Sequence, residues 1–207
     1  MRCVLRFCVA ATLGVSLLVV SGCANTPPTR FYVLTALSSA DTPPGVAPTQ
    51  RELAIGVGPV TLPPYLDRPQ IVTRASRAKL ELAEFDQWAA PLQDSFSRVL
   101  VENMSLLLPT DRVLLAPWPR SIAIDYQVTV DVTHFDGGVD NEVVLAAHWT
   151  IANADGKELI VRKSRFQSPA SAQNYEATVT AMSRTLDALS REISATLLIL
   201  ARHAARR

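Results

Sequence analysis

The sequence predicts an α/β fold, in which a mixed β-sheet with an antiparallel meander is flanked by two main helices, the second long and C-terminal. Three observations lead to this prediction. Apolar and polar residues alternate over residues 122–133, which is the period of a strand with one buried face. Alternating segments follow across turn signals at 136–138 and 155–156. Apolar residues then recur every three or four positions over residues 175–200, the period of a helix.

Short strands are predicted in the first part of the chain. Residues 31–35 are rich in aromatic and branched side chains, and a second strand is predicted over residues 53–60, although two glycines weaken it. Two short strands around a turn are predicted at 70–74 and 79–82. Residues 38–51 hold prolines and a glycine without an apolar period, so we expect a loop there.

Two helices are predicted to cover the sheet. The first lies between Pro91, which suits a first helical turn, and Pro109, which ends the helix. A brief strand at 112–115 follows it. The C-terminal helix has one apolar stripe, which we expect to pack across the sheet, because a lone amphipathic helix usually covers its own core. A partner-binding coiled coil is the alternative, but regular opposite charges beside the stripe are lacking.

The N-terminal residues have the layout of a bacterial secretory signal peptide. Arg2 and Arg6 form a positive start, residues 7–20 carry no charge, and two small residues precede Cys23. A membrane-spanning helix needs about 20 apolar residues, and this run is shorter. We therefore expect residues 1–22 to be a lipoprotein signal peptide that is removed by cleavage.

A cysteine directly after the cleavage site resembles the lipobox of bacterial lipoproteins, which implies that Cys23 is lipidated. Residues 23–30 would then be the lipidated cysteine and a short tether, and residues 31–207 a single periplasmic domain. Acyl chains at about 0.8 kcal/mol per buried methylene would hold the protein on a membrane. Resemblance to enterobacterial sorting, in which aspartate after the cysteine causes inner-membrane retention, makes Ala24 indicate the periplasmic face of the outer membrane.

Composition excludes several functions for the domain after cleavage. Without the two arginines of residues 1–22, the 20 Lys and Arg become 18, against 19 Asp and Glu. This balance gives no electrostatic footprint for nucleic acid. Two of the three cysteines lie in the signal peptide, so the domain has neither a disulfide nor a cysteine metal site.

The sequence shows no catalytic motif, and we predict no enzyme, no cofactor and no metal. Serine-hydrolase elbows, His-Glu-x-x-His and glycine-rich phosphate loops are missing. The predicted alternation places His134 on the apolar face and His148 on the polar face, so a shared metal would require a bulge. Glu81, Glu84 and Asp86 are best explained as a solvated strand edge.

A proline-rich segment at 62–69 is the best candidate for a protein contact. Its prolines exclude both a helix and a central strand, so we expect a stiff, extended loop. Aromatic and arginine side chains in such loops are typical interface anchors. The equally weighted alternative is that Tyr65, Phe85, Trp88 and Trp118 cap the open edge of the core. The candidate partner-binding residues are Leu62, Pro63, Tyr65, Leu66, Asp67, Arg68 and Trp88.

Residues 57–74, VGPVTLPPYLDRPQIVTR, resemble the central motif of the PqiC/YmbA-type ABC-transport auxiliary lipoproteins. One departure lies at residues 85–90, where the family often has an arginine before the tryptophan and an acid after the alanine. A charge-dependent role there is not implied. Further matches follow the family's order: Phe31-Tyr32-x-Leu34, Trp88-Ala89-x-Pro91-Leu92, Pro117-Trp118 and Phe135-Asp136.

The resemblance implies an outer-membrane docking or assembly subunit of an MCE-type intermembrane transport system for lipids or other hydrophobic molecules. Its implied partners are a membrane-anchored MCE-domain protein and an inner-membrane transport component, and the absence of an ATP-binding loop fits a docking subunit. A homo-oligomer, such as a ring-like collar, is compatible with this role. Two alternatives stay open: a stand-alone envelope-stability lipoprotein without a transport partner, and a lipid-modifying enzyme.

Overall fold

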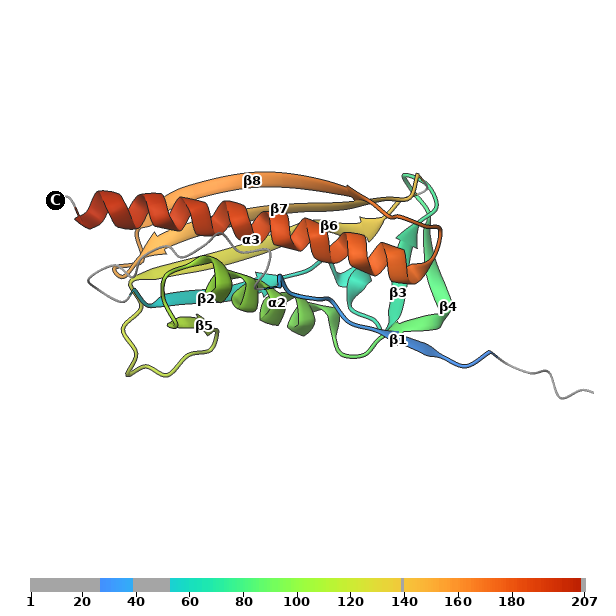
Figure 1. Ribbon diagram of the computed structural model, residues 1–207, viewed down its shortest axis with the longest axis horizontal. Coiled ribbons are helices and arrows are strands. Elements are labelled where there is room, and N and C mark those ends of the chain that lie inside the picture. The colour runs from blue at the N-terminus through green and yellow to red at the C-terminus, as the bar shows by residue number, and fades with distance from the viewer. Residues whose placement is uncertain (1–26, 39–52, 139, 206–207) are drawn as a thin grey trace, which may run out of the picture.

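The computed structural model describes residues 27–38, 53–138 and 140–205 (Figure 1). Cys23 and the expected signal peptide lie outside these residues, as does most of the expected loop at 38–51. The elements are β1 (Arg30–Tyr32), β2 (Ile55–Thr61), the 3-10 helix η2 (Pro64–Leu66), β3 (Gln70–Arg74), β4 (Leu80–Trp88), α2 (Leu92–Leu107), β5 (Val113–Leu115), β6 (Tyr126–Gly137), β7 (Glu142–Asn153), β8 (Glu158–Pro169) and α3 (Tyr175–Ala205).

The eight described strands form one mixed sheet, as expected from the sequence. Strands β6, β7 and β8 are antiparallel neighbours and make the predicted meander. Strand β6 is also paired in parallel with β2, which in turn pairs with β5. Near its end β6 pairs with β3 through Gly137 and Thr73, and β3 continues to β4 and β1. One edge of β6 therefore pairs with β7. The other edge pairs first with β2 and, near the end of β6, with β3.

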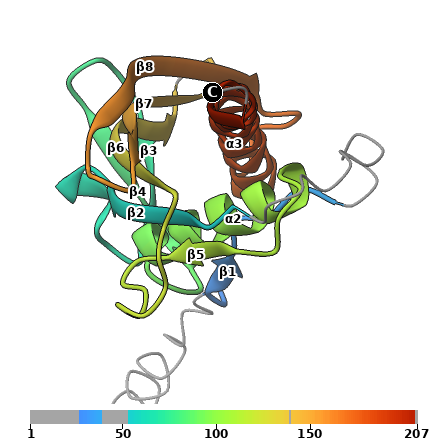
Figure 2. The ribbon, with the colours of Figure 1, turned by 90° about the vertical axis from the view of Figure 1, so that its left-hand side faces the viewer.

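Both helices lie on the same side of the curved sheet (Figure 2). Helix α3 packs on the meander, while α2 packs on β2, β5 and α3. The ring of Phe96 in α2 meets that of Phe135 in β6 edge to face, with centroids 5.2 Å apart. The predicted stripe of α3 is buried at Val179, Met182, Leu186, Leu189, Ile193 and Leu197. The α/β prediction with two main helices is thus confirmed.

Local chemistry explains where the helices begin and end. Pro91 immediately precedes α2, and Leu108 takes an extended conformation beyond its end. Helix α3 begins after Asn174, whose side-chain oxygen accepts a 2.8 Å hydrogen bond from the amide of Ala177. None of the described helices is long and apolar enough to cross a membrane.

The course of β6 differs from the sequence prediction in two ways. The strand starts at Tyr126, not at residue 122, and it continues through Gly137, where the glycines predicted a turn. Gly137 stays in the ladder because it pairs with both Thr73 and Val143. A Cβ at this position would lie 3.1 Å from the methyl group of Thr178, so the glycine permits a close approach of α3 to the sheet.

A bulge between Val132 and His134 also changes which way β6 side chains point. His134 pairs with Ala146, and Asp131 pairs with His148. Since Ala146 and His148 are two residues apart on β7, both histidines lie on the sheet face away from the helices. The prediction that they occupy opposite faces is therefore wrong, because one inserted residue reverses the alternation.

Candidate functional site

The 62–69 segment connects β2 to β3, the two strands that share one edge of β6. The sequence predicts an extended loop, but the segment is not extended throughout, because Pro64–Leu66 form a 3-10 turn. The amide of Leu66 donates to the carbonyl of Pro63 at 2.9 Å, and that of Asp67 to Pro64 at 3.1 Å. Pro64 is compatible with this turn because a first-turn residue needs no N–H donor.

Two candidate contact residues belong to the core. Leu66 is 3% exposed and Trp88 is 5% exposed, although an exposed contact surface was expected. The amide of Trp88 donates a 2.7 Å hydrogen bond to the carbonyl of Pro69, which joins the end of β4 to the segment. Burial of large apolar side chains is favourable, so Leu66 and Trp88 anchor the segment to the core.

Tyr65 fixes the other side of the segment through a buried carboxylate. Its hydroxyl donates a 2.7 Å hydrogen bond to Oδ2 of Asp136, whose side chain is fully buried. Arg74 donates to both oxygens of the same carboxylate, at 3.2 and 3.1 Å. His134 Nε2 lies 2.9 Å from Oδ1. We call these four residues the Asp136 cluster.

Charge explains why Asp136 tolerates burial. Burial by itself would raise the pKa of its carboxyl group, but hydrogen bonds from His134, Arg74 and Tyr65 lower this pKa to about 2. Burial, followed by the hydrogen bond to Asp136, raises the pKa of Tyr65 well above its ordinary value of 10.0. The Arg74 guanidinium also lies 5.9 Å from the centre of the Tyr65 ring. The cluster therefore combines an ionised carboxylate with a neutral phenol.

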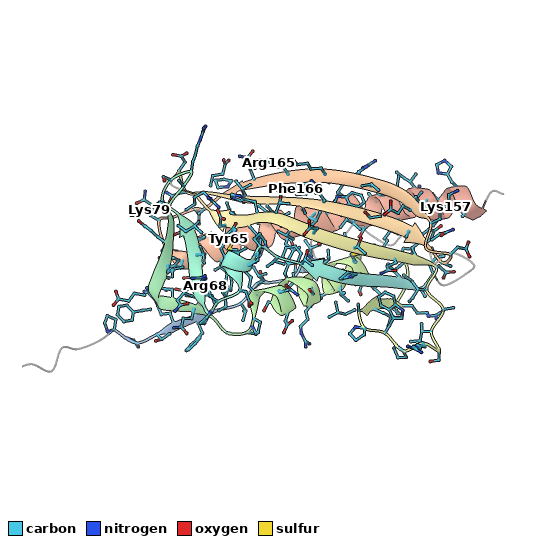
Figure 3. All side chains as sticks on the ribbon, turned by 180° about the vertical axis from the view of Figure 1, so that it is seen from behind. Tyr65, Arg68, Lys79, Lys157, Arg165 and Phe166 are labelled. Atoms are coloured by element: carbon cyan, nitrogen blue, oxygen red, sulfur yellow. The ribbon has the colours of Figure 1, made fainter. Side chains whose placement is uncertain are left out.

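The exposed part of the 62–69 segment is Pro64, Asp67, Arg68 and Pro69, while Leu62, Pro63 and Tyr65 are half-buried. Figure 3 shows Tyr65 and Arg68 on the side of the molecule opposite to that of Figure 1. Two hollows of about 320 Å³ each flank the segment. One contains Leu62, Pro63 and Asp94, and the other contains Arg68 and Trp88. The structure thus places five of the seven candidate residues at or near the surface.

A second buried carboxylate lies in β4. Asp86 is 3% exposed and accepts hydrogen bonds from Arg30 at 2.7 and 2.8 Å and from Tyr32 at 2.7 Å. The hydrogen bond from Arg30 lowers the pKa of Asp86. The interpretation of Glu81, Glu84 and Asp86 as a solvated strand edge is therefore wrong for Asp86, because β1 covers it.

Of the other predicted loop aromatics, Trp118 packs on β2. A Cβ on Gly56 would lie 2.6 Å from its ring, so the glycine in β2 makes room for the indole. Phe85 and Trp118 are both half-buried. Phe85 lies within β4 and not in a loop, and the aromatics of this group that join the core are Trp88, which is buried, and Tyr65, which packs against the core.

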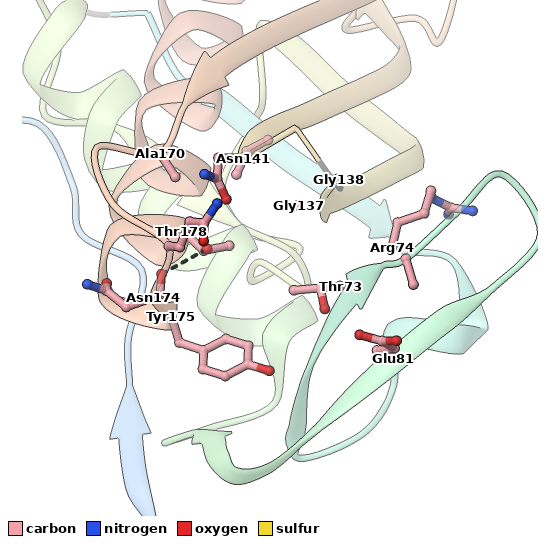
Figure 4. A pocket seen from close by; sticks show the side chains of 13 residues that line it. Thr73, Arg74, Glu81, Gly137, Gly138, Asn141, Ala170, Asn174, Tyr175 and Thr178 are labelled. Atoms are coloured by element: carbon pink, nitrogen blue, oxygen red, sulfur yellow. Dashed lines mark hydrogen bonds between the residues drawn. The ribbon is translucent and has the colours of Figure 1, made fainter.

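A cleft of about 570 Å³ lies between β3, the β6–β7 turn and the start of α3 (Figure 4). Most of the side chains that line this cleft are polar. One of them is Arg74, which donates hydrogen bonds to Asp136. The dashed line in Figure 4 joins the Thr178 hydroxyl to the carbonyl of Asn174 at 3.0 Å, the first turn of α3. Its residues hold no nucleophile paired with a base.

Metal or catalytic chemistry finds little support among residues 27–38, 53–138 and 140–205. Within these ranges no three His, Cys, Asp or Glu side chains gather so as to hold a metal ion. His134 and His148 share a sheet face, but His134 is bonded to Asp136. The carboxylate of the Asp136 cluster already accepts from three side chains and holds them in place.

Sequence reasoning missed that Asp136 joins the segment to the sheet. Tyr65, Arg74 and Asp136 all occur in the motifs of the family resemblance, but a single sequence does not indicate that they meet in space. His134 lies outside those motifs, and the bulge that brings it to Asp136 cannot be read from an alternating pattern.

Comparisons with known proteins agree with this architecture. The family model for the ABC-type transport auxiliary lipoprotein component matches residues 32–194. Intermembrane transport lipoprotein PqiC of Escherichia coli (strain K12) and that of Shigella flexneri are each 31% identical over 131 residues, which cover 63% of this chain and 67% of the relative. These matches confirm the resemblance to PqiC-type lipoproteins.

Two solved structures share the fold. Protein XCC0632 from Xanthomonas campestris has a TM-score of 0.70 at 17% identity, and the match covers 86% of this chain and 100% of that one. The crystal structure of an uncharacterized protein has a TM-score of 0.66 at 23% identity, covering 83% and 99%. Fold and sequence together show that the chain belongs to the family of ABC-type transport auxiliary lipoprotein components.

Proposed function

We propose that this protein is the outer-membrane docking or assembly subunit of an MCE-type intermembrane transport system, in which it is not an enzyme. Family membership and the name of its relative, intermembrane transport lipoprotein PqiC, support a transport role. The observation that carries the docking role is the 62–69 segment, which is fixed from both sides and still exposes Asp67 and Arg68.

A segment fixed in this way is suited to binding. Leu66 and Trp88 anchor it in the core, and Tyr65 ties it to Asp136. Because these contacts already order the backbone of the segment, association with a partner does not have to compensate for ordering a free loop. In this proposal the exposed residues Asp67 and Arg68 contact the partner, and Leu62 and Pro63 line the hollow beside them.

The anchor is the second part of the proposal. Residues 1–22 would be removed as a signal peptide, Cys23 would be acylated, and Ala24 would direct the protein to the periplasmic face of the outer membrane. The MCE-domain protein and the inner-membrane component would approach from the periplasm. Cys23→Ala should leave the fold unchanged and abolish function, because the domain would no longer be held at the membrane.

Co-purification of the MCE-domain protein from membranes tests the docking surface. We expect Arg68→Glu to reduce recovery of that partner about tenfold, the loss that corresponds to about 1.4 kcal/mol. Arg165→Glu is the matched control, since Arg165 is exposed on β8 (Figure 3). Tyr65→Ala is unsuitable, because it would also release the segment from Asp136.

Equal recovery for both arginine variants, in folded protein, would exclude the 62–69 segment as the contact. Recovery of no transport partner with the unaltered protein would instead favour a stand-alone envelope-stability lipoprotein. Turnover of lipid by the purified protein would revive the lipid-modifying enzyme, for which the described residues provide no catalytic set.

A further inference from the structure

Strand β1 and the residue that follows it present two large apolar side chains to solvent, Phe31 and Val33. Phe31 is 64% exposed and Val33 is 56% exposed, whereas the alternate residue Leu34 is buried and Tyr32 is half-buried. Alternation along an extended chain therefore places Phe31 and Val33 together on the outward side. Exposed apolar side chains that lie next to one another indicate a contact surface more than isolated ones do.

Hydrogen bonds on both sides of this pair fix its outward position. Strand β1 pairs in parallel with β4 from Arg30 to Tyr32, and Arg30 and Tyr32 both bind the buried carboxylate of Asp86. Farther along, the amide of Leu37 donates a 2.7 Å hydrogen bond to the side chain of Asn103. Phe31 and Val33 are thus exposed on an extended segment that is held on both sides, at residues 30–32 and at Leu37.

Covalent distance places this pair near the proposed anchor. Phe31 lies eight positions after Cys23, and a fully extended chain spans at most about 3.6 Å per residue, or roughly 29 Å. Exposed Lys79 in the β3–β4 turn lies at the same end of the long axis as β1 (Figures 1 and 3), but β1 pairs with the other end of β4, at residues 86–88, so this cation is not part of the apolar surface. The apolar pair on a short tether is by itself suited to the interface of a phospholipid membrane.

We propose that Phe31 and Val33 insert into the interface of the phospholipid membrane that holds the acylated Cys23. This inference rests on the lipid anchor of the proposed function. The acyl chains supply attachment, and the apolar pair supplies orientation, because a second contact stops the domain from rotating freely about its tether.

A second copy of the chain is the competing occupant, and the available area argues against it. Phe31 and Val33 together offer at most a few hundred Å² of apolar surface, judged by the area that aromatic side chains bury. A stable protein interface needs about 800 Å² on each partner. A membrane interface accepts a smaller patch, since the acyl chains already hold the protein there.

The test uses the full acylated protein in vesicles of phosphatidylethanolamine and phosphatidylglycerol. Val33→Cys supplies the one free thiol for an environment-sensitive fluorophore, because Cys3 and Cys8 leave with the signal peptide and Cys23 is acylated. Lys157→Cys is the control: Lys157 is exposed at the end of the molecule away from Lys79 (Figure 3). Vesicles that contain nitroxide-labelled lipid then report contact with the bilayer, and Phe31→Cys provides a second probe position.

We expect nitroxide lipid to reduce fluorescence at positions 31 and 33 by about twofold and to leave position 157 unchanged, as for side chains buried roughly 5–10 Å into the interface. Vesicle-bound protein whose label at both positions resists quenching would overturn the inference while leaving the anchor intact. A shielded but unquenched label would identify a second copy as the occupant. Mass spectrometry that finds no acyl chain on Cys23 would overturn both the anchor and this inference.

Discussion

Asp136→Asn tests whether the buried carboxylate holds the 62–69 segment by its charge. Asparagine keeps the shape of the side chain but removes the ionised acceptor for Arg74 and His134. A pKa lowered from 3.8 to about 2 corresponds to about 2 kcal/mol of stability, at about 1.4 kcal/mol for each tenfold change. Because the partners also lose hydrogen bonds, we expect a loss of about 2–4 kcal/mol at pH 7.

The sign of the pH dependence follows from the direction of the pKa change. A carboxylate whose pKa is lower in the folded state contributes its full stability above the unfolded pKa, here 3.8, and loses it as the pH falls towards about 2. About 1 kcal/mol of the contribution is already lost at pH 3. The difference between Asp136→Asn and the unaltered protein should therefore shrink by about this amount between pH 7 and pH 3.

Urea unfolding followed by circular dichroism, in a Cys23→Ala background, measures this difference. Asp131→Asn is the control, because Asp131 lies on the same strand but is exposed, and its effect should stay below about 1 kcal/mol. A loss for Asp136→Asn that is equally large at pH 7 and pH 3 would refute the electrostatic explanation. A loss no greater than that of the control would show that the cluster does not stabilise the segment.

Three further substitutions test other contacts. Tyr65→Phe removes the 2.7 Å hydrogen bond to the cluster carboxylate and should cost about 1–2 kcal/mol in urea unfolding. Gly56→Ala places a methyl group 2.6 Å from the Trp118 ring and should cost about 1–3 kcal/mol, and Trp118→Val in the same chain should recover part of this loss. Arg30→Met removes the main partner of Asp86, so amide exchange in β1, measured by mass spectrometry, should become faster while that of α3 stays unchanged.

Regular periodicity predicted the parts of the fold that depend on local pattern. The meander and both helices follow from alternation and from the apolar stripe, because each pattern specifies one buried face. The pairing of β1 with β4 and of β2 with β6 was not predictable in this way. These contacts join residues more than 50 positions apart, and a strand's own sequence does not identify its neighbour in the sheet.

In the candidate site, too, features that depend on local sequence were predictable and contacts between distant residues were not. Proline content correctly singled out the 62–69 segment as irregular, but it could not reveal that Leu66 and Trp88 are buried, since burial depends on what packs above and below. Asp136 was assigned to a turn because two glycines follow it, whereas pairing on both sides of Gly137 keeps the strand intact. The bulge before His134 completes the cluster, and a single inserted residue leaves no mark in composition.

The parallel pairing of β1 with β4 also determines how the domain bears mechanical load. If Cys23 is held in a membrane while a partner pulls the domain into the periplasm, tension enters through the N-terminal end of β1. Force along the strand axis shears all the β1–β4 backbone bonds and the two Arg30–Asp86 bonds together, instead of opening them one at a time. The ion pair between Arg30 and Asp86 would then resist separation of β1 from the sheet under load.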